Sequence, residues 1–290
     1  MIASDNRYTG IYRCRDKKIL IGKKTLVMGI LNCTPDSFSD GGRFTDVESC
    51  MRQADLLVSS GCDVIDIGGE ATNPKVQPIT AEEEISRIIP VIRAIREKYG
   101  IPLSVDTYKA KTAAAALEAG CDIVNDITGL FGDPDMAKTA ASYKAGVIVM
   151  FNSRIFGAAE NKPEQDILAR AEEEISKSIK IAADAGIEAE YIMTDPGIGF
   201  GTNRQQDGAL TEGLIRFGFD GKYPILYAAS RKRYVKALSG KDDVTEEELD
   251  RITAGLSVTA AAAGAAMVRV HDAAGSRQAL NAFDSVFYGG

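Results

Sequence analysis

Short apolar runs alternate with segments of helical periodicity along the whole chain, and this alternation limits the possible folds more than any other feature. We expect eight strands, at residues 25–31, 63–67, 101–105, 122–125, 146–150, 191–194, 223–227 and 266–270. We expect helices at residues 46–60, 81–98, 109–119, 134–144, 163–185, 205–217, 246–263 and 273–286. This pattern is typical of a mainly parallel sheet, which can be a closed barrel or an open, doubly wound sheet.

The loops that follow the predicted strands favour the closed barrel. An open dinucleotide-binding sheet needs a GxGxxG turn after its first strand, and here that turn reads NCTPDSFSDGG. An open sheet also concentrates its polar groups at one switch point, whereas here they follow almost every strand. We therefore predict an α/β fold, a (β/α)8 TIM barrel over residues 25–290, preceded by a short N-terminal β-hairpin within residues 1–24.

Composition excludes several classes of partner. The net charge of −7 and the sequence pI of about 5.0 leave no general basic surface for nucleic acid, although a few local cations could still hold an anionic small molecule. No apolar run approaches the ~18 residues of a membrane-spanning helix, so no membrane partner is expected. The polar start and an odd number of cysteines without a CxxC pair predict a cytoplasmic protein with reduced thiols.

Polar side chains stand at the carboxyl end of nearly every predicted strand, and in a barrel these ends meet at one mouth. A single aspartate there more often caps the next helix than acts in a site. Separate caps, however, need not come with asparagine, lysine, arginine and histidine. The strand-end residues are Asn32, Asp66, Asp106, Asn125, Asp126, Met150, Asn152, Asp195, Ser230, Arg231, Lys232, Arg269, His271 and Asp272.

These residues include two chemically distinct sets. Carboxylate and amide groups, suited to the N–H and C=O edges of a flat heterocycle, form the first set: Asp106, Asn125 and Asp195. Cationic or donor groups, suited to phosphate, form the second: Lys232, Arg269 and the only histidine, His271.

A glycine-rich stretch, TDPGIGFG, follows the sixth predicted strand. Its glycines at positions 197, 199 and 201 permit a close approach of the backbone to a ligand, or they form only a turn. Phe200 could stack on a planar ring or belong to the core, and the sequence pattern leaves both possibilities open.

Taken in order, the motifs MGILNCTPDSFSDGG, DIGGEATNP, SVDT, VNDI, DPGIGFG, SRK and RVHD resemble those of the dihydropteroate synthase family. The resemblance extends from about residue 25 to residue 285. It implies a (β/α)8 barrel enzyme, a transferase of folate biosynthesis. Its substrates would be 6-hydroxymethyl-7,8-dihydropterin pyrophosphate and p-aminobenzoate, and its products dihydropteroate and pyrophosphate. It also implies Mg²⁺ as the metal ion and a homodimer.

The resemblance further assigns roles to individual residues, position by position. Pterin binding is implied for Asp106, Asn125, Met150, Asp195, Phe200 and Lys232, of which Asp106, Asp195 and Lys232 are implied to be catalytic. Pyrophosphate binding is implied for Asn32, Arg269 and His271, with Asn32 also close to Mg²⁺. Binding of p-aminobenzoate is implied for Phe38, Thr72, Pro74 and Ser230.

Four positions depart from the family pattern. Ala71 replaces a usual serine, Asn73 a usual arginine, Phe151 a usual histidine and Thr202 a usual lysine. These departures leave three alternatives to the synthase: a paralogue with altered or weak activity, a pterin-binding methyltransferase domain acting on methyltetrahydrofolate and a corrinoid protein, and a pterin-binding protein without catalysis. The methyltransferase would not require the SRK, RVHD or NCTPDSFSDGG motifs.

Overall fold

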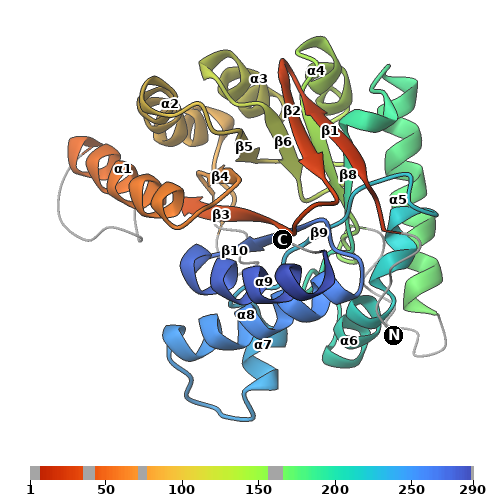
Figure 1. The fold of residues 1–290 in the computed structure, drawn as a ribbon. Helices are drawn as coiled ribbons and strands as arrows, with labels where there is room; N and C mark the ends of the chain where they lie inside the picture. Colours follow the sequence, from red (N-terminus) through yellow and green to blue (C-terminus); the bar gives the residue numbers. More distant parts are fainter. Residues whose placement is uncertain (1–6, 35–42, 71–76, 156–165, 289–290) are drawn as a thin grey trace.

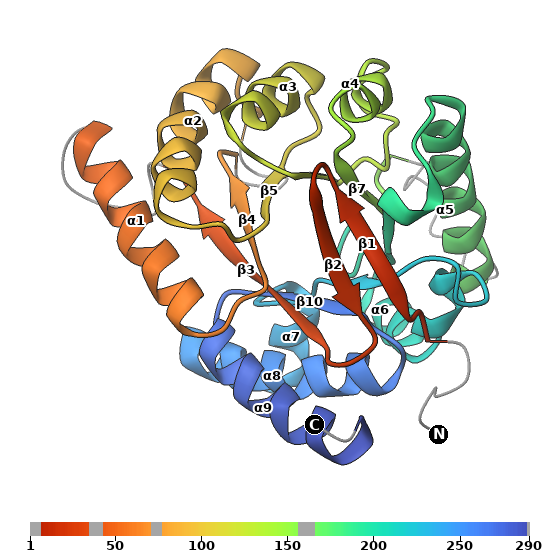
Figure 2. The ribbon, with the colours of Figure 1, turned by 45° about the horizontal axis from the view of Figure 1, so that its top comes forward.

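The parallel strands form a nearly closed barrel surrounded by helices (Figures 1 and 2). The computed structural model describes residues 7–34, 43–70, 77–155 and 166–288. The strand order is β8-β7-β6-β5-β4-β3-β10-β9, and a parallel bridge between Thr194 and Ile225 joins the two edges. The strands are β3 (Leu26–Asn32), β4 (Val64–Gly68), β5 (Leu103–Asp106), β6 (Ile123–Asp126), β7 (Gly146–Met150), β8 (Ile192–Asp195), β9 (Leu226–Tyr227) and β10 (Met267–Val270). The predicted (β/α)8 barrel is confirmed.

Helices connect successive strands, and polar caps fix several of their starts. Thr80 Oγ1 accepts the Glu83 N–H at 3.2 Å, and Asn203 with Gln206 and Thr245 with Glu248 form reciprocal capping boxes. The helices are α1 (Arg43–Ser59), α2 (Ala81–Lys98), α3 (Ala110–Ala119), α4 (Met136–Ser142), α5 (Ile167–Asp184), α6 (Arg204–Glu212), α7 (Arg233–Leu238), α8 (Glu246–Ala262) and α9 (Ala273–Phe287).

Two helical segments differ from the prediction. The helix expected over residues 205–217 ends at Glu212, and the 3₁₀ segments η3 (Leu214–Gly218) and, elsewhere, η2 (Ala189–Tyr191) complete the connections. A Cβ on Gly213 would lie 2.7 Å from Leu168 Cδ2, so a larger residue at this change of direction would require the Leu168 side chain to move. Helix α7 was not predicted, because six residues are too few for a helical period to be recognised.

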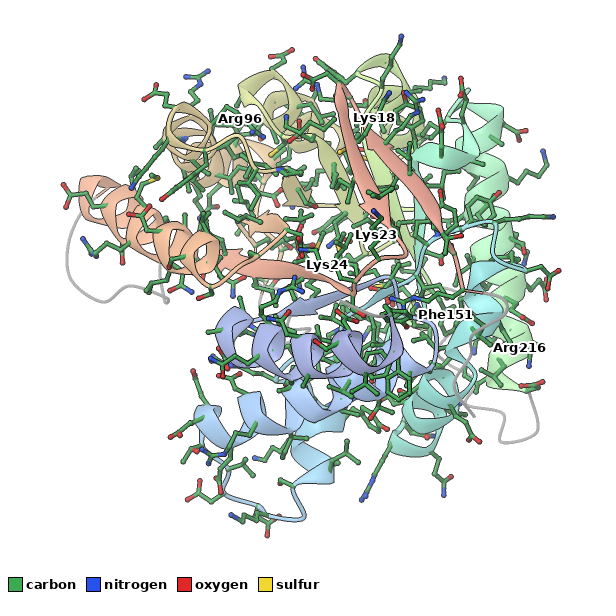
Figure 3. The ribbon with its side chains drawn as sticks, in the orientation of Figure 1. Lys18, Lys23, Lys24, Arg96, Phe151 and Arg216 are labelled. Carbon is green, nitrogen blue, oxygen red and sulfur yellow. The ribbon has the colours of Figure 1, made fainter. Side chains whose placement is uncertain are left out.

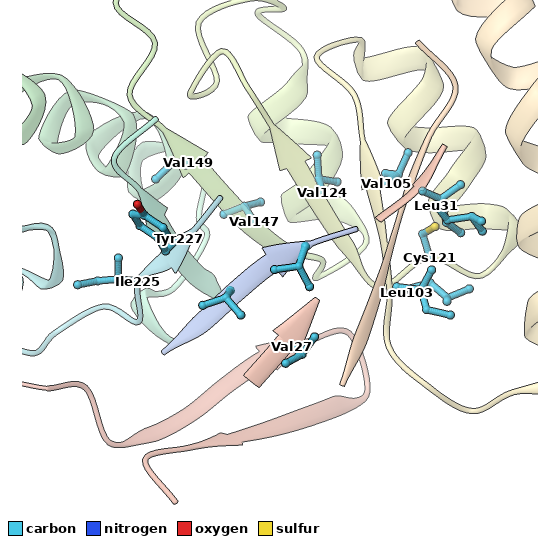
Figure 4. Packing of buried hydrophobic residues seen from close by; sticks show 14 of the residues in the cluster. Val27, Leu31, Leu103, Val105, Cys121, Val124, Val147, Val149, Ile225 and Tyr227 are labelled. Carbon is cyan, nitrogen blue, oxygen red and sulfur yellow. The ribbon is translucent and has the colours of Figure 1, made fainter. Parts of the chain in front are cut away.

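Side chains alternate along each strand between two environments. One set packs with helix residues such as Ile88 and Leu117 in the layer between barrel and helices, and Figure 4 shows Val27, Val105 and Val149 of this set. The other set points into the barrel. Where the strands begin, all but the buried Ser104 of β5 are apolar: Leu26, Met28, Val64, Ile123, Ile148, Met193, Leu226 and Met267.

An antiparallel hairpin, β1 (Gly10–Cys14) and β2 (Lys17–Ile21), lies across the end of the barrel where the strands begin (Figure 2). Its buried side chains, Tyr12, Cys14, Ile19 and Ile21, belong to the same apolar cluster as the inner residues of the strands. The hairpin therefore covers the end of the barrel where the strands begin, opposite the mouth at which the strands end. The predicted hairpin is confirmed, and a domain division at residue 24 stays a prediction.

Candidate active site

The alternation of the strands places the predicted site residues inside the barrel. A side chain two positions after an inner apolar residue points to the same interior, one step nearer the mouth. Most of these mouth-side residues are polar or charged. The inner apolar residues and their mouth-side successors are Val64 and Asp66, Ile123 and Asn125, Ile148 and Met150, Met193 and Asp195, and Met267 and Arg269.

A buried arginine joins the polar groups of neighbouring strands. Arg269 donates from Nε to Asp66 Oδ2 at 2.6 Å and from Nη2 to Asp106 Oδ2 at 2.7 Å. Asn125 Nδ2 donates to the same Asp66 oxygen at 3.1 Å. The structure thus brings together Asp106, Asn125 and Arg269, which the sequence placed on three separate strands.

Asp66 holds this network together, yet the sequence assigned it no role. It is fully buried, and its other oxygen, Oδ1, has no hydrogen-bond partner in the described part of the chain. The sequence spacing could have revealed Asp66. It lies two residues after the inward-facing Val64 in VIDIG, just as Asn125 lies two residues after Ile123, so both side chains point into the barrel.

Burial shifts the pKa values of three ionisable groups of the mouth toward neutral pH. It raises the pKa of Asp106 to about 7 against the opposing charge of Arg269. It raises the pKa of Asp195 to about 6, although Lys232 and a 2.7 Å hydrogen bond from the Gly197 N–H favour the ionised form. Burial also lowers the pKa of Lys232 to about 8, against the attraction of Asp195. Such values are typical of functional groups.

Lys232 and Phe200 form one wall of the mouth. Lys232 Nζ donates to the Ile198 carbonyl at 2.8 Å and lies 4.4 Å from the centroid of the Phe200 ring. A Cβ on Gly199, whose φ is +79°, would lie 3.2 Å from Lys232 Cδ. This glycine therefore makes room for the lysine side chain, and the two roles that the sequence left open for it, a ligand contact or a turn, stay predictions.

The SRK turn is anchored from outside the barrel. Arg231 has a left-handed φ of +57°, and its guanidinium binds Asp250 of α8 at 2.8 and 2.7 Å and Glu246 at 2.5 Å. This anchor fixes the backbone between Ser230 and Lys232.

His271 is joined to the same turn. Its Nδ1 lies 2.9 Å from Ser230 Oγ, which also accepts the His271 backbone N–H at 3.2 Å. Burial, with the charges of Arg231 and Arg269, lowers the pKa of His271 to about 3. The imidazole is therefore neutral near pH 7, and it can serve a phosphate as a hydrogen-bond donor through its one ring N–H rather than as a cation.

Asn32 ends β3 with an exposed side chain at the mouth. A Cβ on Gly68 would lie 4.0 Å from Asn32 Oδ1 and 3.9 Å from Asp106 Oδ2, so the amide and the carboxylate flank this glycine. No group of three or more His, Cys, Asp or Glu residues within the described ranges could hold a metal ion. The residues present suit Mg²⁺ bound by one amide oxygen together with phosphate and water oxygens.

Not every predicted residue belongs to this mouth. Asp126 accepts the Thr128 N–H and hydroxyl, both at 2.7 Å, and so fixes a turn; it does not cap the next helix, α4, which was the alternative for strand-end aspartates. Ser230 is buried beside His271, as described. The other residues assigned to p-aminobenzoate, Phe38, Thr72 and Pro74, lie outside the described residues.

Two of the four departures from the family pattern can be located. Phe151, labelled in Figure 3, is fully buried in the layer outside the strands. The guanidinium carbon of Arg170 in α5 lies 5.7 Å from its ring centroid. Thr202 is buried and donates to Asp207 Oδ1 at 2.5 Å. Neither side chain joins the Asp66–Arg269 network. Ala71 and Asn73 lie outside the described residues.

A barrel mouth lined by carboxylates, an amide, a lysine and an arginine defines a site for a small polar heterocycle carrying an anionic group. Residues 28–271 match the model of the pterin binding enzymes, and the chain belongs to this family.

Relatives and solved structures agree with this membership. The dihydropteroate synthase of Clostridium beijerinckii is 39% identical over 270 residues, which are 93% of this chain and 97% of that protein. Dihydropteroate synthase of Xanthomonas albilineans, solved with 4-aminobenzoic acid, is 34% identical with a TM-score of 0.88 and coverage of 96% of this chain and 98% of that one. The same enzyme solved with 7,8-dihydropteroate has 33% identity, a TM-score of 0.85 and the same coverage.

Proposed function

We propose that this enzyme is a dihydropteroate synthase, which joins 6-hydroxymethyl-7,8-dihydropterin pyrophosphate to p-aminobenzoate and releases pyrophosphate. The observation that carries the proposal is the ring of Asp106, Asn125, Asp195 and Lys232, which all face one mouth of the barrel. The related synthases, which match nearly their whole length, support the same reaction.

The four polar residues at the mouth suit the hydrogen-bonding groups of a pterin. A pterin presents N–H donors and C=O and ring-nitrogen acceptors along one flat edge, and these match carboxylate oxygens, the Asn125 amide and the Lys232 ammonium. Met150 and Phe200 offer apolar contact with the faces of the ring. Asp66, through Arg269 and Asn125, holds two of these partners in place.

The charged groups at the mouth suit departure of pyrophosphate. The C–O bond breaks, pyrophosphate leaves with the electron pair, and a pterin cation remains. In this reaction the guanidinium of Arg269 and the neutral ring N–H of His271 would bind the leaving group, and Asp106 and Asp195 would stabilise the cation. Asn32 would hold Mg²⁺, which when bound neutralises further negative charge on the phosphates.

The amine of p-aminobenzoate then forms the new C–N bond and loses a proton. Ser230, with Phe38, Thr72 and Pro74, is the proposed contact set for this second substrate. We also propose, from the resemblance alone, a cytoplasmic homodimer. Among the described residues, no helix is long and apolar enough to cross a membrane.

A direct assay tests the reaction. The purified protein with Mg²⁺ and the pterin pyrophosphate should release pyrophosphate and form dihydropteroate when p-aminobenzoate is added. Binding of the pterin without any product above background would contradict the synthase and favour a binding protein or an altered paralogue. Pyrophosphate release without incorporation of the amine would indicate a different acceptor.

A further inference from the structure

The glycine-rich loop after β8 is held by two buried polar side chains. Asp207, near the start of α6, accepts the Gly199 N–H at 2.8 Å and the Thr202 hydroxyl at 2.5 Å, both through Oδ1. Thr202 Oγ1 is a second acceptor for the Gly199 N–H, at 3.2 Å. Both side chains are only 3% and 3% exposed, respectively. The three groups are therefore mutually hydrogen-bonded, and they fix the middle of the loop to α6.

The residues on either side of Gly199 contact the lysine of the mouth. Lys232 Nζ donates to the Ile198 carbonyl at 2.8 Å and lies 4.4 Å from the centroid of the Phe200 ring. A Cβ on Gly199 would lie 3.2 Å from Lys232 Cδ, so the loop backbone passes close to the lysine side chain. A displacement of Gly199 would therefore move both groups that contact the ammonium.

Asp207 also brings a buried negative charge near this lysine. Burial lowers the pKa of Lys232, and the charge of Arg269 lowers it further. Three carboxylates favour the protonated lysine: Asp195, Asp106 and Asp207. The first two are proposed to bind the pterin. Asp207 is instead bonded to the loop, so its charge can continue to act on the ammonium when a ligand engages the other two.

We propose that Asp207 and Thr202 are positioning residues of the enzyme. They fix the glycine-rich loop and thereby hold Phe200 and the Lys232 ammonium where these meet the pterin. The proposal rests on the proposed synthase reaction. It also gives a physical role to a departure in the sequence, because Thr202 replaces a usual lysine. A hydroxyl can donate to Asp207 and accept the Gly199 N–H at once, whereas a lysine ammonium has no acceptor.

Substitution of Thr202 tests the geometry. Thr202→Val keeps the shape of the side chain and removes the hydroxyl, so the KM for pterin pyrophosphate should rise about two- to tenfold while kcat changes little, which corresponds to loss of about one hydrogen bond. Thr202→Ser keeps the hydroxyl and should restore the KM. The matched control is Thr128→Val, because the Thr128 hydroxyl also donates to an aspartate, Asp126, and accepts a backbone N–H, from Gly132. This control should lower stability and leave the KM unchanged.

Substitution of Asp207 tests the charge. Both hydrogen bonds go to one carboxylate oxygen, and the amide oxygen of Asp207→Asn can accept them, so the loop should keep its place. The kcat/KM for pterin pyrophosphate should fall at alkaline pH as Lys232, with a pKa of about 8, loses its proton. In Asp207→Asn this fall should move to lower pH by about 0.5 pH unit or more. Asp126→Asn removes a buried carboxylate outside the mouth and should leave the fall in place.

The outcomes separate this proposal from the proposed reaction. An unchanged KM in Thr202→Val, or an unmoved alkaline fall in folded Asp207→Asn, would overturn the positioning role while the synthase reaction stands. If the unaltered enzyme makes no product, the synthase reaction fails. Calorimetry of 6-hydroxymethyl-7,8-dihydropterin binding across the same pH range then decides the proposal. Weaker binding in Thr202→Val, with loss of affinity at lower pH in Asp207→Asn, supports it, and unchanged binding in both variants overturns it.

Discussion

The two halves of the barrel interior are built from the same strands and differ in chemistry. Near the hairpin the inward side chains are buried and, apart from Ser104, apolar, whereas two residues further along the same strands they include Asp66, Asn125, Asp195 and Arg269. The apolar half gains free energy from burial, at about 25 cal/mol per Å². The polar half buries charges whose desolvation opposes folding. Stability and function therefore reside in successive layers of one sheet.

Substituting Asp195 should give the largest effect on ligand affinity, and it should show most clearly that the polar layer serves binding rather than stability. In Asp195→Asn the charge is lost but the shape is kept, so the affinity for pterin pyrophosphate should fall by about 10- to 150-fold, since a charged hydrogen bond contributes about 1.5–3 kcal/mol. Calorimetry measures this loss.

The stability of the same variant should not fall. Burial raises the pKa of Asp195 from 3.8 to about 6, so its contribution to stability is fully present below pH 3.8 and is lost as the pH rises through 6. At pH 8 the ionised group therefore opposes folding, and Asp195→Asn should unfold at an equal or higher denaturant concentration.

A second strand-end aspartate provides the matched control. Asp126 is also buried with a pKa of about 6, but it fixes a turn outside the mouth. Both Asp126 oxygens accept backbone hydrogen bonds, and an amide nitrogen cannot accept the Leu130 N–H that Oδ2 accepts at 3.1 Å, so Asp126→Asn should lower stability by about 1–2 kcal/mol and leave pterin affinity unchanged. Equal loss of affinity in both variants would contradict the assignment of the pocket to the inward residues.

Ile148 tests the apolar layer. It is fully buried, and Ile148→Ala should lower the free energy of unfolding by about 2–5 kcal/mol because it leaves a cavity. The kcat/KM of the folded enzyme should be unchanged. Met150→Ala, two residues further along β7, should instead weaken pterin binding. A fall in kcat/KM for folded Ile148→Ala, measured well below its melting temperature, would show that the two layers are not separate.

The sequence predicted the layers better than the individual contacts. Alternation of strands and helices, together with polar strand ends, was enough to predict the barrel and its mouth. It did not reveal Asp66, because the role of that carboxylate depends on Arg269, which is 203 residues away in the chain. It did not reveal the separation of Phe151 from the mouth either, because no single motif states which side of a strand faces inward.

The turn after β9 shows a second limit of sequence reasoning. Arg231 lies within the SRK motif, yet its side chain points to Asp250 and Glu246 of α8 and leaves the mouth to its neighbours. Helix α7 was not predicted, because its six residues are too few to show a helical period. Both facts depend on tertiary packing that local patterns do not encode.

The pH dependence of kcat/KM for pterin pyrophosphate should reflect the polar layer alone. The rate should rise as Asp195 and Asp106, with pKa values of about 6 and 7, lose their protons, and fall as Lys232 loses its proton near pH 8. The apparent pKa values of the acidic and alkaline limbs of this pH profile belong to the three interacting groups together rather than to single residues. The alkaline limb should disappear in Lys232→Arg if that variant stays active, because arginine remains charged; an unaltered limb would assign it to another group.

The smallest expected effect is a change in stability, and it concerns a polar atom in the apolar half of the barrel interior, near the hairpin. Tyr12 of the hairpin is fully buried, and its hydroxyl has no hydrogen-bond partner in the described part of the chain. Tyr12→Phe removes this group and should raise the free energy of unfolding by about 1 kcal/mol, since an unsatisfied buried donor costs about 1–3 kcal/mol.

Tyr8→Phe is the matched control: the Tyr8 hydroxyl donates to the Ile11 carbonyl at 2.9 Å, so its removal should lower stability by about 0.5–1.5 kcal/mol. Denaturant unfolding of both variants measures the difference. A loss of stability in Tyr12→Phe would show that a buried water molecule satisfies the hydroxyl, and that the hairpin end of the barrel is not wholly apolar.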